Sequence, residues 1–121
     1  MAFWPTHYRF DGGFIDGSAS EEMTLGVWLK RNIHPKVAIY ANQNFPDIAY
    51  YSGFTVRDLP DDGPELTKAL EAMPAGSLLV AYRANDDGED VPAEPDIADL
   101  DRNPRYQRLT EMRTLVVYRV R

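Results

Sequence analysis

The sequence contains no cysteine. Disulfide bonds and thiolate zinc sites are therefore excluded, although cysteine-free domains occur on both sides of a membrane. Basic residues are also few, because 13 lysines and arginines stand against 19 aspartates and glutamates, for a net charge of −6. Phosphate backbones repel a chain of this sign, and no local basic stripe offsets it. We therefore expect no nucleic acid as a partner.

Long apolar runs and the motifs of common catalytic sites are missing too. No apolar run in the sequence approaches the roughly 20 residues that span a bilayer, and no signal peptide is visible. The two histidines, His7 and His34, have no second ligand at metal-binding spacing. Glycine-rich phosphate loops and a nucleophile-elbow serine are also absent. We expect no catalytic residue, no metal site and no cofactor in this chain.

The length and composition predict one globular domain over residues 1–121, since 44% of the residues are apolar. Residues 1–17 are expected to form an irregular lead-in that is rich in aromatic rings. Such rings suit either a strand packed on the core or a juxtamembrane segment at the membrane–water interface. Residues 84–104 hold eight carboxylates and few apolar anchors, which predicts an acidic, mobile loop.

Helix and strand patterns alternate through the middle of the chain. Strands are predicted at 36–41, 54–59 and 77–82, and helices at 18–33, 46–52 and 62–73. Short links between such elements are typical of parallel βαβ units with right-handed crossovers. The pattern therefore predicts a small, Rossmann-like α/β sandwich of three layers, with a mostly parallel sheet and helices on its faces.

The boundaries and the C-terminal part give further predictions. We expect a capping box between Ser18 and Glu21, helix caps at Asn44 and Asp62, and a left-handed helix end at Gly53. Residues 113–121 are predicted to be a strand near an edge of the sheet, because it carries several arginines. Residues 105–112 suit either a helix or a strand that forms a hairpin with it.

Polar side chains gather where the predicted parallel strands end. Ligands of open α/β sheets bind outside the carboxyl ends of the strands, and amides and carboxylates suit a sugar or a peptide acceptor. The candidate ligand-binding residues are Asn42, Gln43, Asn44, Asp47, Arg57 and Asp58, with Arg83 near them. Turn formation and helix capping are the alternative explanation of Asn44 and Asp47.

Three short motifs carry a resemblance to a known family: WLKRN at 28–32, AYYSG at 49–53 and VVYRV at 116–120. With the acidic turn after Leu59-Pro60, they resemble the soluble C-terminal domains of membrane-embedded polyprenyl-phosphate-sugar glycosyltransferases. This clan includes protein mannosyltransferases and aminoarabinose transferases. The likeness covers roughly residues 18–83 and the last strand, whereas the acidic segment between these two parts departs from the family.

The resemblance implies a membrane-anchored protein with this domain on the extracytoplasmic side, against the membrane domain of the same polypeptide. There it would be a non-catalytic accessory domain that helps to position a sugar or protein acceptor, because the family's catalytic aspartate lies in the membrane domain. The alternative hypothesis is a free-standing α/β module that binds a small polar ligand such as a sugar or nucleotide. A stand-alone enzyme would need perturbed carboxylates in a cleft.

Overall fold

The computed structural model describes residues 17–42, 45–82 and 95–121, with side chains described from residue 21 on. Its helices are α1 (Gly17–Asn32), α2 (Pro46–Ser52), α3 (Gly63–Ala72) and α4 (Ile97–Arg102). Its strands are β1 (Ile39–Ala41), β2 (Val56–Asp58), β3 (Leu78–Tyr82), β4 (Tyr106–Glu111) and β5 (Leu115–Val120). Each helix and strand predicted between residues 18 and 82 is present, and the three strands are shorter than predicted.

The sheet is mixed, with the strand order β2-β1-β3-β5-β4. Strand β1 pairs in parallel with β2 and β3, whereas β5 pairs antiparallel with β3 and β4. The prediction of a mostly parallel, Rossmann-like sheet is therefore correct only for the β2-β1-β3 half. A short turn joins β4 to β5, closed by a 2.7 Å hydrogen bond from the Met112 N–H to the Leu115 carbonyl. So short a connection can join only antiparallel neighbours.

The predicted edge position of residues 113–121 is wrong, because β5 lies between β3 and β4. Five of its six side chains are buried, on both faces of the sheet, and only Arg119 is exposed. Strand β4 is the edge strand instead, with Gln107, Arg108 and Glu111 exposed. For residues 105–112 the hairpin alternative is thus confirmed.

The prediction of a mobile loop over residues 84–104 is wrong for its second half. Residues 97–102 form helix α4, which buries Leu100 at 3% exposure. Residues 83–94 lie outside the described residues, as do residues 1–16 of the lead-in predicted at 1–17. Leu100 and Ile97 pack on the apolar cluster of one face of the sheet, so part of the acidic segment is folded against the sheet.

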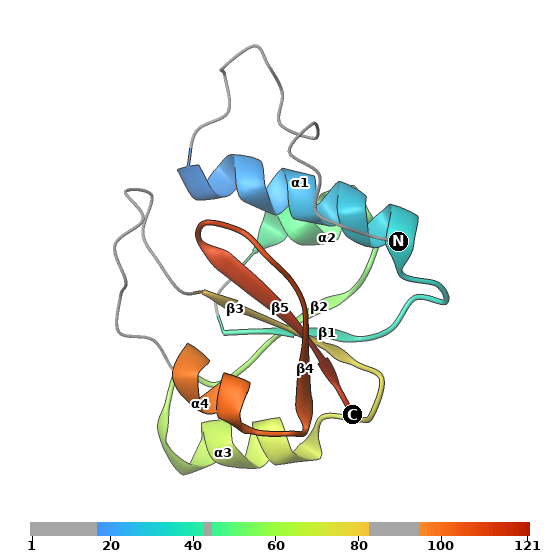
Figure 1. The fold of residues 1–121 in the computed structure, drawn as a ribbon. Coiled ribbons are helices and arrows are strands. Elements are labelled where there is room, and N and C mark those ends of the chain that lie inside the picture. Colours follow the sequence, from blue (N-terminus) through green and yellow to red (C-terminus); the bar gives the residue numbers. More distant parts are fainter. Residues whose placement is uncertain (1–16, 43–44, 83–94) are drawn as a thin grey trace.

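Helices cover both faces of the sheet, which gives the three predicted layers (Figure 1). On one face, Leu78 and Val80 of β3 pack with α1 and α2 in one apolar cluster. On the other face, Leu79 and Ala81 pack with α3 and α4 in a second cluster. The alternation follows from the two-residue period of a strand, and it makes β3 a strand buried on both sides. Among the described helices, none is long and apolar enough to cross a membrane.

Helix α1 packs closely on α2 at Gly26. A methyl group at that position would lie 2.7 Å from the Tyr51 Cβ and 3.2 Å from the Ile48 carbonyl oxygen. The first distance is well inside van der Waals contact, so the two helices can approach this closely only because residue 26 has no side chain. Leu25, Trp28 and Leu29 form the buried apolar face of α1.

The predicted helix caps are only partly confirmed. Gly53 ends α2 in the left-handed conformation, with φ at 74°. Phe45, rather than Asn44, is the residue before α2, and Asn44 lies outside the described residues. Asp62 precedes α3 as predicted, but its side chain makes no capping bond. The Ser18 side chain is not described, while Glu21 accepts bonds from the Thr114 N–H at 2.8 Å and its hydroxyl at 2.9 Å.

Candidate functional site

Of the residues predicted to bind a ligand, the structure describes Asn42, Asp47, Arg57 and Asp58. Asn42 lies at the carboxyl ends of β1 and β3, where its Oδ1 accepts a 3.2 Å hydrogen bond from the Tyr82 N–H. Arg57 and Asp58 are exposed neighbours in the edge strand β2 and therefore point to opposite faces of the sheet. Gln43, Asn44 and Arg83 lie outside the described residues. A ligand at this edge stays a prediction.

Asp47 lies near the carboxylate of Glu22, which was not among the predicted site residues. Glu22 of α1 accepts a hydrogen bond from the Asp47 backbone N–H, which lies in the first turn of α2. Burial raises the pKa of Glu22 from 4.5 to about 7, and the negative charge of Asp47 is the second cause of this increase. The hydrogen bond from the Asp47 N–H has the opposite effect and lowers the pKa. Glu22 is four residues before Gly26 and so lies on the same helix face. That spacing is the one sequence feature that could have placed it near α2.

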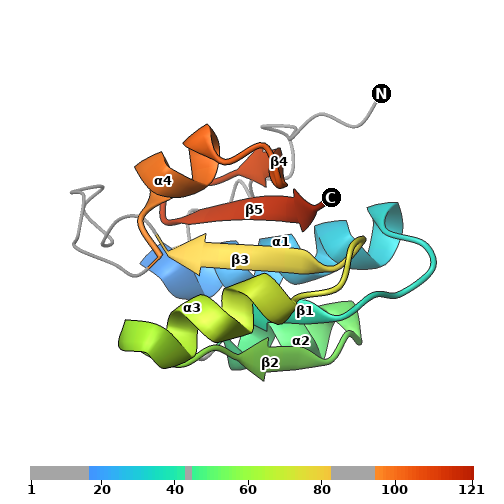
Figure 2. The same ribbon diagram turned by 90° about the horizontal axis from the view of Figure 1, so that it is seen from below.

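A groove of about 510 Å³ is lined by residues of α3, of α4 and of the segments that flank α4. The two helices lie on the face of the sheet opposite α1 and α2 (Figure 2). Apolar side chains form much of its lining: Leu66, Leu70, Pro95, Leu100 and Tyr106. Polar groups complete the lining: Thr67, Glu71, Asp96, Asp99, Asn103 and Arg105. The lining thus combines apolar contact area with about as many polar groups, and small-molecule sites also use polar groups to fix the orientation of a ligand. None of these residues belongs to the site predicted from sequence.

Arg105 fixes one end of this groove. Its guanidinium donates hydrogen bonds to the carbonyl oxygens of Leu70 and Met73, both at 2.5 Å, and to that of Glu71 at 3.3 Å. The last carbonyls of a helix have no partner within the helix, so Arg105 satisfies the C-terminus of α3. Since Arg105 directly precedes β4, these bonds also hold the end of α3 against the edge of the sheet.

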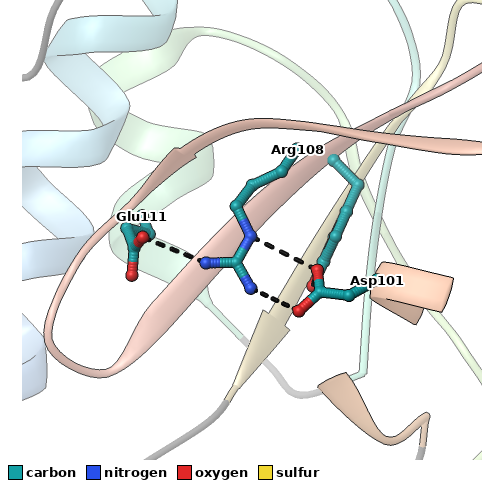
Figure 3. Close-up of polar contacts among 4 residues, drawn as sticks. Asp101, Arg108 and Glu111 are labelled. Atoms are coloured by element: carbon teal, nitrogen blue, oxygen red, sulfur yellow. Dashed lines mark hydrogen bonds and ion pairs between the residues drawn. The ribbon is translucent and has the colours of Figure 1, made fainter. Parts of the chain in front are cut away.

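Asp101 fixes α4, the second wall of the groove. Its carboxylate accepts a 2.9 Å hydrogen bond from the Tyr118 hydroxyl and a 2.6 Å bond from the Arg108 guanidinium. Figure 3 shows Arg108 between Asp101 and Glu111, to which it also donates at 3.0 Å. Burial, followed by the bond to Asp101, raises the pKa of Tyr118 to about 12, so its hydroxyl stays a donor.

The described polar side chains form no evident catalytic centre. The buried hydroxyl of Ser77 donates to the Pro74 carbonyl at 2.6 Å, and that of Ser52 accepts from the Phe54 N–H at 3.0 Å. No three metal-ligating side chains come together within the described part of the chain. The arrangement can hold a ligand in the α3–α4 groove, and it brings no nucleophile and base together there.

Comparison of the chain with protein-family models, curated proteins and solved structures found no match.

The Glu22–Asp47 pair predicts a pH-dependent stability. Because the folded protein disfavours ionised Glu22, the free energy of unfolding should fall as the pH rises from about 4.5 to about 7. Carbon-13 NMR of the Glu22 carboxyl group should show a midpoint near 7. Asp47→Asn should lower this midpoint and leave it above 4.5, since burial is the larger cause.

Asp58→Asn, at an exposed position of β2, is the matched control and should leave the Glu22 midpoint unchanged. A midpoint near 4.5 in the unsubstituted protein would contradict the effect of burial on Glu22. A midpoint that Asp47→Asn does not move would show that the two carboxylates do not interact.

Proposed function

We propose that this chain is a non-catalytic binding domain whose ligand occupies the groove between α3 and α4. The observation that carries the proposal is the groove itself. Its volume of about 510 Å³ falls in the range of roughly 300–1,000 Å³ that small-molecule sites occupy. The lining offers apolar contact area from both helices and from Tyr106, together with polar groups that orient a ligand.

The hydrogen bonds of the polar groups that line the groove support binding rather than catalysis. Arg105 donates to three carbonyls of α3, and the Asn103 Oδ1 accepts a 3.0 Å bond from the Arg105 N–H. The Thr67 hydroxyl donates to the Gly63 carbonyl. These groups therefore build the walls of the groove, and the carboxylates of Glu71 and Asp96 are left to contact a ligand. Of the described lining residues, none is a histidine or a cysteine.

The family resemblance supports a setting for this binding domain. In that setting it is an accessory domain of a membrane-embedded polyprenyl-phosphate-sugar glycosyltransferase, on the extracytoplasmic side, where it helps to hold a sugar or protein acceptor. The matching motifs fall in α1, α2 and β5, and Tyr50 of α2 is 80% exposed. The exposed tyrosine offers the membrane domain a contact that the scaffold itself does not need.

The alternative setting is a free-standing module, and the groove favours it to the same degree because its described walls need no second polypeptide. The coding region upstream of Met1 separates the two settings. The glycosyltransferase setting predicts several apolar segments there, each of about 20 residues. A stop codon directly upstream would exclude that setting and leave the free-standing module.

The binding function predicts that a ligand raises the melting temperature of the protein. A ligand at 100 times its Kd adds about 2.7 kcal/mol to the free energy of unfolding. We expect this effect from at least one class in a panel of sugars, nucleotides, short peptides and amines, without consumption of the ligand. Thr67→Trp, which fills the groove from an exposed position of α3, should abolish the effect.

Lys68→Trp is the matched control, because Lys68 is also exposed on α3 and does not line the groove. It should keep the ligand effect, and circular dichroism should show that both variants fold. A panel without any effect, or an effect that survives Thr67→Trp, would exclude the groove as the binding site.

A further inference from the structure

We infer that the α3–α4 groove accepts a small organic cation, namely a protonated amine on an apolar body. This inference rests on the proposed binding function and adds the chemical class of the ligand. The apolar body would lie against Leu66, Leu70, Leu100 and Tyr106. The positive charge would lie near the carboxylates that line the groove.

The charges around the groove favour a cation. Three carboxylates line it, those of Glu71, Asp96 and Asp99, against one guanidinium, that of Arg105. Asp99 pairs with Arg102, and its side chain is 67% exposed. In the described part of the chain, no basic side chain pairs with Glu71 or Asp96. Two carboxylates, one on α3 and one at the start of α4, are thus available to an incoming positive charge.

An anionic ligand would find no equivalent partner among the described lining residues. Arg105 is the only cation among them, and its guanidinium bonds three carbonyls at the C-terminus of α3. That helix end carries a partial negative charge, which offsets the charge of the arginine. A ligand carboxylate would have to displace these bonds and would also lie near the carboxylates that line the groove. Both costs select against anions, and the net charge of −6 adds to them at low ionic strength.

Three probes with one apolar body and different head groups test the inference: 4-phenylbutylamine, 4-phenylbutanol and 4-phenylbutyrate. Their Kd values are measured at low salt by titration of the backbone amide signals of the whole chain. The amine should bind most tightly and shift the signals of Leu66, Leu70 and Leu100, and 4-phenylbutyrate should bind most weakly. Asp96→Asn should weaken amine binding about two- to fivefold, as expected for a solvent-exposed ion pair.

Control variants and added salt separate the effect of the ligand's charge from binding in the groove as such. Asparagine caps a helix as well as aspartate does, so Asp96→Asn should leave α4 and the binding of 4-phenylbutanol unchanged. Asp58→Asn, which lies outside the groove, should not affect amine binding. Added salt should weaken amine binding and leave the alcohol unaffected.

The outcomes are distinguishable. If the alcohol or 4-phenylbutyrate binds in the groove as tightly as the amine, the inference fails and the proposed function stands. If Asp96→Asn leaves the Kd of the amine unchanged, the inference also fails. If no probe shifts the amide signals of the groove residues, the inference fails. If, in addition, no ligand of the panel raises the melting temperature, the proposed function fails as well.

Discussion

The carboxylate of Asp101 is the contact on which the α3–α4 face depends. Helix α4 has only six residues, and a helix so short is not stable by itself in water. Its position therefore comes from tertiary contacts, namely the buried Leu100 and the bonds of Asp101 to Arg108 and Tyr118. Tyr118 belongs to β5, which lies between β3 and β4, so Asp101 connects the helix to the interior of the sheet. Without α4 the groove would have only one wall.

Local patterns predicted those parts of the fold that local physics decides. The strand pattern at 77–82 predicted β3, and Gly53 predicted the left-handed end of α2. Helix α4 could not be predicted in this way, because half of its six residues are charged and Asp101 bonds partners seven and 17 residues away. The interior position of β5 was missed because its arginines suggested an edge, whereas its side chains 115–118 are all buried.

The candidate site was harder to predict, because long-range contacts build it. Arg105 bonds carbonyls that lie 32 to 35 residues earlier in the chain, and no motif marks that pairing. The Glu22–Asp47 pair likewise depends on how closely α1 approaches α2, which the missing side chain of Gly26 permits. The sequence analysis correctly placed Asn42 at the carboxyl ends of the parallel strands, where it bonds the backbone of β3. The groove between α3 and α4 could not be predicted, because residues far apart in the sequence form it.

A double-mutant cycle on Asp101 and Tyr118 tests the central claim most directly. Urea unfolding gives the free energy of unfolding for the unsubstituted chain, for Asp101→Ala, for Tyr118→Phe and for the double variant. We expect Asp101→Ala to cost about 1–3 kcal/mol, because it leaves a buried hydroxyl without a partner. It should cost about 1 kcal/mol less in the Tyr118→Phe background, where that hydroxyl is already absent. Effects that add to within about 0.3 kcal/mol would contradict the claim that Asp101 holds α4 on the sheet.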